Sequence, residues 1–153
     1  MINNMALFWK KNKNEKNEQA VKTPASQTIS LSDDIRNYMD NSNGLALIDY
    51  KGMTPEEDEK VKAFAKQIGV TYRIDRKKDV MTALTGSKFE RMKADLEDVI
   101  LFKMLFFDNE EQVKQFSDYI NSSEITPAAK GNRMIVGMLN GRYVNNETNT
   151  SNS

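Results

Sequence analysis

The fold of this 153-residue chain is decided by residues 44–74, which read GLALIDYKGMTPEEDEKVKAFAKQIGVTYRI. The run that begins at Leu45 has the length and apolar character of a strand covered on both faces. Residues 70–74 alternate between apolar and polar and are rich in β-branched and aromatic side chains, which predicts a second strand. With a helix between them, the two strands predict a βαβ unit with parallel strands and a right-handed crossover.

The helix between the strands has clear start and stop signals. Thr54 can cap the first N–H groups, Pro55 suits the first helical position, and Glu57 completes a capping box. Gly69 is a typical C-terminal stop. One buried stripe is expected from the apolar residues at helical spacing, which are Val61, Phe64, Ala65 and Ile68.

The rest of the chain extends this pattern on both sides. We predict a short helix over residues 31–39, a helix that follows Arg76–Asp79 and ends at Thr85-Gly86, and another short helix that begins at Ser87. A strand is predicted over residues 99–107 at the centre of the sheet. Asp108 is predicted to cap a further helix, with Glu111 at its third position. A strand over residues 134–139 turns back at Asn140-Gly141, a strong hairpin signal. The predicted order is β-α-β-α-α-β-α-β-β, an α/β fold of the α+β sandwich kind in which helices pack on a small mixed sheet.

The polar ends of the chain suggest three regions. Residues 1–32 are expected to be a flexible basic arm, with a short apolar patch at Met5–Trp9. Residues 33–144 form the predicted globular domain. Residues 145–153 contain no apolar side chain and are expected to be a disordered polar tail.

Composition excludes most catalytic and metal chemistry. The chain has no Cys and no His, so disulfides, thiolate metal sites and a Ser-His-Asp triad are impossible within it. It lacks the glycine motifs that cradle nucleotides, and its paired acids fall at predicted helix starts, where capping explains them. The longest apolar run, residues 99–107, is far shorter than the ~20 residues that span a bilayer. We therefore expect no enzyme activity, no catalytic residue, no cofactor, no metal and no membrane partner.

Charge is balanced overall but segregated along the chain. The net charge is zero, yet residues 51–93 carry eleven Lys and Arg against seven Asp and Glu. Two basic clusters, Tyr50-Lys51-Gly52 and Arg76-Lys77-Lys78, follow the two strands of the predicted βαβ unit. Because ligand contacts in open α/β sheets gather at the carboxyl ends of the strands, the clusters predict a phosphate or RNA site at that edge. The alternative is that these cations only make one end of the sheet soluble.

The order of these motifs resembles the bacterial and organellar large-subunit ribosomal protein ten family, the stalk-base protein. That family shows an apolar strand, then Tyr-Arg-Gly-Leu-Thr, a helix ending at Gly, a strand leading into Lys-Asn-Thr-Leu, an Ala-Leu helix and a Gly-x-x-Phe turn. The corresponding stretches here are Tyr50–Thr54, Gly69, Tyr72–Ile74, Ala83-Leu84 and Gly86–Phe89.

The resemblance implies a structural, non-catalytic protein of the large ribosomal subunit that binds rRNA at the stalk base, near the translation-factor site and beside ribosomal protein eleven. Tyr50, Lys51, Gly52 and Thr54 match the family's first motif, with Lys in place of Arg. Arg76, Lys77 and Lys78 fall on the family's Lys-Asn-Thr. Of that motif, only the cation at the first position is kept here. The implied RNA-binding residues are therefore Tyr50, Lys51, Gly52, Thr54, Arg76, Lys77 and Lys78, which would position the protein on the backbone rather than read bases.

The resemblance stops before the long C-terminal helix that carries the acidic stalk protein in that family. No helix with an apolar stripe can be drawn over residues 145–153, so the acidic stalk protein is a doubtful partner. Either stalk binding is lost or it has moved to the patch around Trp9. The many Asn and Lys residues suggest an AT-rich genome, which favours a mitochondrial ribosome over a bacterial or other organellar one. The alternative function is a ribosome-assembly factor or protein-interaction module of the same fold.

Overall fold

The computed structural model describes residues 30–144. The predicted tail, the patch around Trp9 and all but the last residues of the predicted arm lie outside this range. The chain divides into two compact units, Met1–Asp34 and Ile35–Ser153. Of the first unit only residues 30–34 are described, and there the Ser30 hydroxyl accepts a hydrogen bond from the backbone N–H of Asp33. The second unit contains the whole sheet.

The elements follow the predicted order. They are α3 (Leu31–Asp40), β2 (Gly44–Ile48), α4 (Pro55–Ile68), β3 (Thr71–Arg73), α5 (Lys77–Leu84), α6 (Met92–Leu96), β4 (Lys103–Phe107), α7 (Glu110–Ile120), β5 (Met134–Leu139) and β6 (Arg142–Tyr143). Both halves of the predicted capping box are present at the start of α4, and Gly69 ends that helix with φ +80°. The predicted Asn140-Gly141 turn joins β5 to β6, with both residues at positive φ. Two predicted helix starts are wrong: α6 begins at Met92 and not at Ser87, and the cap of α7 is Asn109, with Gln112 at the third position, and not Asp108.

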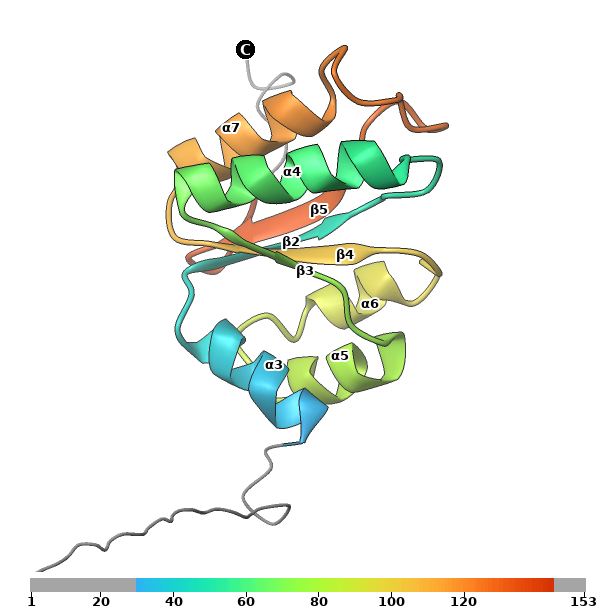
Figure 1. Ribbon diagram of the computed structural model, residues 1–153. Helices are drawn as coiled ribbons and strands as arrows, with labels where there is room; N and C mark the ends of the chain where they lie inside the picture. The colour runs from blue at the N-terminus through green and yellow to red at the C-terminus, as the bar shows by residue number, and fades with distance from the viewer. Residues whose placement is uncertain (1–29, 145–153) are drawn as a thin grey trace, which may run out of the picture. The chain divides into compact units, whose positions relative to one another are not determined.

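The sheet lies between two layers of helices (Figure 1). Helices α4 and α7 pack on one face, against Ala46, Ile48, Leu105 and Phe107. The second unit's part of α3, together with α5 and α6, packs on the other face, against Leu45, Leu47, Met104 and Phe106. Strand β2 is fully buried on both faces, as its apolar run predicts. The α+β sandwich is therefore confirmed.

The pairing of the strands corrects two details of the prediction. The strand order is β3-β4-β2-β5-β6, and every hydrogen-bonded pair is antiparallel, so the sheet is not mixed. Strands β2 and β3 do run in the same direction, but β4 lies between them. The apolar character of a strand indicates its burial, not its neighbours, and the three half-buried residues of β3 suit an edge position.

The apolar run 99–107 is only partly a strand, and it is not the central one. Strand β4 starts at Lys103, opposite Ile48, the last residue of β2. Before Lys103 there is no neighbouring strand to accept the backbone hydrogen bonds, because β3 pairs only with residues 104–106. Residues 99–102 therefore lie outside the sheet, and Ile100 is 83% exposed.

Gly44 is needed for close packing in this sheet. It lies opposite Phe107 of β4, and a Cβ added to Gly44 would overlap the Phe107 ring. We expect Gly44→Ala to lower the free energy of unfolding by about 1–3 kcal/mol, the usual cost of overpacking. Urea unfolding of Gly44→Ala, Phe107→Leu and the double variant tests this. The double variant should lose less unfolding free energy than the sum of the losses in the two single variants. Losses that simply add would contradict the proposed clash.

Candidate functional site at the shared end of strands β2 and β3

The two predicted basic clusters come to the same edge of the sheet. Because β2 and β3 run in the same direction, the segments that follow them leave the sheet on one side. Tyr50 from the first cluster and Arg76 and Lys77 from the second line one hollow of about 400 Å³, which we call the β3-side hollow. The convergence expected from the sequence is thus present, although β4 separates the two strands.

The backbone around Gly52 forms a tight turn. The Met53 N–H donates to the Tyr50 carbonyl at 3.0 Å, and Gly52 has φ +83°, a conformation that favours glycine. A Cβ at Gly52 would meet no atom within 4 Å, so the turn, not crowding, requires the glycine. Thr54 follows as the helix cap, accepting the Glu57 N–H at 3.1 Å. Gly52 and Thr54 therefore shape the loop that carries Lys51.

The four predicted cations do different things. Lys51 and Lys78 are exposed, and Arg76 is exposed but forms an ion pair with Asp79 at 3.0 Å. Lys77 is committed to the fold, because its Nζ donates to the carbonyls of Glu97 (2.7 Å) and Val99 (2.9 Å). Three cations thus remain accessible at this edge, and the fourth holds the segment that leads into β4.

A buried ionic network lies behind these loops. Lys103 of β4 is only 7% exposed, and its Nζ donates to Asp58 Oδ1 of α4 at 2.7 Å. The same oxygen accepts the Tyr72 hydroxyl at 3.2 Å. The Lys103 ammonium also lies 5.0 Å from the ring centres of Tyr50 and Tyr72, within cation–π range. The network links β4, α4, β3 and the segment after β2.

The network shifts two pKa values. Burial opposes ionisation of the Asp58 carboxyl, but hydrogen bonds and charge from Lys103 and Lys62 outweigh it and hold the Asp58 pKa below its usual value. Burial, together with the Asp58 carboxylate, raises the pKa of Tyr72. Tyr72 therefore stays a neutral hydrogen-bond donor at neutral pH, and the Asp58 carboxyl stays ionised.

Arg133 fixes the loop after β2 from inside the protein. Its side chain is fully buried, just before β5. The guanidinium donates to the backbone carbonyls of Asp49 (2.8 Å), Lys51 (3.1 Å) and Thr126 (2.9 Å). In addition, the Asp49 N–H donates to the Arg133 carbonyl at 2.7 Å. The backbone on both sides of Tyr50 is therefore attached to residue 133.

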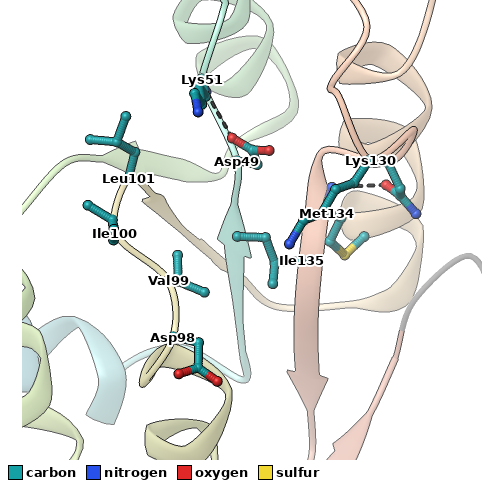
Figure 2. Close-up of a pocket in the computed structure, with 10 residues that line it drawn as sticks. Asp49, Lys51, Asp98, Val99, Ile100, Leu101, Lys130, Met134 and Ile135 are labelled. Atoms are coloured by element: carbon teal, nitrogen blue, oxygen red, sulfur yellow. Dashed lines mark hydrogen bonds between the residues drawn. The ribbon is translucent and has the colours of Figure 1, made fainter.

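A second hollow, of about 500 Å³, lies between residues 98–101 and the start of β5, and we call it the β5-side hollow (Figure 2). Lys51 and Lys130 supply cations to its lining, and Asp49 and Asp98 supply carboxylates. Ile100 lines both hollows, so the two adjoin. Lys51 thus faces a different hollow from Arg76 and Lys77, which divides the predicted site into two neighbouring parts.

Three parts of this edge were missed by sequence reasoning. Lys103 interrupts an apolar run, and a lone lysine in such a run is a signal for a buried partner, here an acid of the α4 first turn. For Arg133, the only sequence feature that could have indicated a buried role is its position directly before an apolar strand. Ile100 and the neighbouring Leu101 were expected inside the sheet, because their apolar character concealed their exposure.

Acidic residues at this edge are few, and two of them are paired. Among residues 30–144 no group of three or more acidic residues is placed to hold a metal ion. Asp79 pairs with Arg76, and Asp75 accepts two hydrogen bonds from Arg73. Within the same residues, no helix has the length and apolar character to cross a membrane.

Comparison with known proteins identifies no family. No protein-family model matches the chain, and no curated protein matches it significantly.

The Lys103–Asp58 pair predicts how stability depends on pH. A lowered carboxyl pKa stabilises the folded state above the carboxyl's ordinary pKa of about 4, and this contribution is lost as pH falls through the folded-state pKa. We expect Asp58→Asn to reduce the free energy of unfolding at pH 7 by about 1–3 kcal/mol and to make its decline below pH ~4 shallower. Urea unfolding from pH 7 to pH 2 measures both. The exposed Asp118→Asn is the control, and equal profiles for the two variants would contradict the assignment.

The buried guanidinium of Arg133 predicts a second stability effect. Arg133→Met leaves the carbonyls of Asp49, Lys51 and Thr126 without this donor. The free energy of unfolding should fall by about 1–3 kcal/mol for each carbonyl that finds no other partner. Arg133→Lys should recover only part of the loss, because one ammonium replaces a planar fork of donors. Thermal and urea unfolding are the measurements. Arg142→Met, at an exposed arginine of β6, should change stability by less than ~0.5 kcal/mol.

Proposed function

We propose that this protein is a structural, non-catalytic component of the large ribosomal subunit. It binds large-subunit rRNA at the stalk base, near the translation-factor site and beside ribosomal protein eleven, in a mitochondrial ribosome. The observation that carries the proposal is the set of exposed cations, Lys51, Arg76 and Lys78, at the shared end of β2 and β3. The motif order shared with the ribosomal protein ten family supports the same placement.

In this proposal the seven predicted RNA-binding residues have different roles. Lys51, Arg76 and Lys78 contact phosphates, Arg76 with its planar fork and the lysines as point charges. Tyr50, Gly52 and Thr54 set the path of the loop that presents Lys51. Lys77 acts by position, because its ammonium is held by two backbone carbonyls.

A rigid support favours a backbone-binding role over a merely solvated end of the sheet. The guanidinium of Arg133 holds the carbonyls of Asp49 and Lys51, and the ammonium of Lys103 lies within cation–π range of the Tyr50 ring. A loop whose backbone is already fixed loses less conformational entropy when its lysine contacts phosphate, which increases affinity. Solubility alone requires no such buried attachment.

Salt dependence of RNA binding tests the proposal. The double variant Arg76→Ala/Lys78→Ala should bind a stalk-base fragment of large-subunit rRNA more weakly. Its slope of log K against log salt should fall by up to about 0.7–0.9 for each phosphate that the variant no longer neutralises. The control is Lys66→Ala/Lys114→Ala, two exposed lysines of α4 and α7. An equal slope change in both double variants would mean that only net charge matters. Lys77→Ala should lower the free energy of unfolding and leave the slope of log K against log salt close to that of the wild type.

Sedimentation of the endogenous protein separates a ribosomal component from the alternative assembly factor. Stoichiometric co-migration with mature large subunits and monosomes, at moderate and high salt, is the expected result. Migration only with precursor particles would identify an assembly factor instead. Migration as a free protein would contradict both.

A further inference from the structure

Exposed aliphatic side chains gather around the two hollows. Within residues 35–144, five large hydrophobic side chains are exposed, and four of them line these hollows. They are Ile74 (55% exposed), Ile100 (83%), Leu101 (44%) and Ile135 (36%). We call these four residues the isoleucine surface. Scattered exposed apolar residues are normal, but a contiguous group marks an interaction site.

The fold holds this surface in place. Lys77 donates to the carbonyls of Glu97 and Val99, directly before Ile100, and Phe102 directly after Leu101 is buried. The exposed pair therefore lies between two anchored points. Exposed hydrophobic side chains on an anchored segment form a defined surface that a partner can contact.

Ile135 is brought to the surface by an irregularity of β5. Along the β2–β5 pair, Leu47 is opposite Val136, but Ile48 is opposite Met134, so Ile135 is an extra residue in a β-bulge. Bulges redirect side chains and are common beside functional sites. In Figure 2 the Ile135 side chain points from β5 toward the segment that carries Val99 and Ile100, across the β5-side hollow.

The lining favours a protein segment over a nucleobase. The β5-side hollow is walled by aliphatic groups and contains no aromatic ring, whereas unstacked bases are held mainly on aromatic or Arg faces. A hollow of about 500 Å³ is within the size range of pockets that accept a ligand or a few side chains. Branched aliphatic side chains of a partner suit such walls.

Charge at the hollow specifies the partner further. The ammonium groups of Lys51 and Lys130 have no hydrogen-bond or ion-pair partner in the described part of the chain. Figure 2 shows Lys51 at one end of the hollow, Asp98 at the other, and Lys130 reaching in from the side of β5. The Asp49 carboxylate already accepts the Lys51 N–H at 2.9 Å. Asp98 lies at the end of the hollow opposite Lys51, so a carboxylate beside the aliphatic groups of the partner would complement the lysines at the Lys51 end.

We propose that the isoleucine surface, together with Lys51 and Lys130, is a docking site for a protein segment that presents aliphatic side chains next to an acidic residue. The inference does not depend on RNA binding. Its test uses Ile100, Leu101 and Lys130, and the RNA test uses Arg76 and Lys78. Lys51 belongs to both sites and is left unchanged.

Selection from a random peptide library displayed on phage, with the full-length chain as target, tests the docking site. The expected result is enrichment of peptides with two or more aliphatic residues beside Asp or Glu. Synthetic copies should bind Ile100→Ser/Leu101→Ser at least tenfold more weakly than the wild type. Lys130→Glu should weaken binding about fivefold or more, and Lys66→Glu on α4 should have no effect. Isotope-labelled protein should show amide shifts at residues 98–101 and 130–135.

Several outcomes would overturn the proposal. Absence of enrichment, or enrichment of basic or aromatic peptides, would reject the stated partner. Unchanged peptide affinity in Ile100→Ser/Leu101→Ser would place binding elsewhere. If that variant instead loses rRNA-fragment affinity tenfold and no peptide is selected, the surface belongs to the RNA interface. If the wild type dimerises in sedimentation equilibrium and the variant does not, the occupant is a second copy. Both substituted positions are exposed, so the variant should unfold like the wild type.

Discussion

The burial of β2 on both faces is the constraint on which the rest of the structure depends. All five of its residues are buried, so none of them can present a polar group to solvent. The polar residues Asp49, Tyr50 and Lys51 lie directly after the end of the strand. The same burial forces a helix layer onto each side of the sheet, since neither face can be left to water.

Two buried cations stabilise that edge in different ways. The Lys103 ammonium has a carboxylate, Asp58, as its partner, and their charges compensate each other inside the protein. The Arg133 guanidinium instead satisfies backbone carbonyls of two loops. The first connects secondary-structure elements, and the second connects the segments between them. The accessible cations at the edge are thus carried on a backbone that the interior holds.

Local signals were sufficient for much of the fold. The capping box of Thr54 and Glu57, the stop at Gly69 and the Asn140-Gly141 turn each depend on a few adjacent residues, so the sequence alone predicted them. Strand neighbours depend on contacts between distant segments, and a single apolar run carries no information about them. For the same reason the convergence of Tyr50 and Arg76 was predicted from strand direction, whereas the commitment of Lys77 to two carbonyls was not. The two carbonyls belong to Glu97 and Val99, and the sequence places Val99 in a strand over residues 99–107.

The strand order also determines when the protein can fold during synthesis. Central strand β2 is synthesised before its neighbour β5, and Arg133 lies 84 residues after the Asp49 carbonyl that it binds. Until then a nascent chain that has paired β2 with β4 keeps one edge of β2 open, with apolar side chains on both faces. Such an edge is a template for pairing with other chains. The chain therefore has to reach residue 139 before both edges of β2 are paired, and until that point the open edge of β2 is accessible to a chaperone or to a wrong partner.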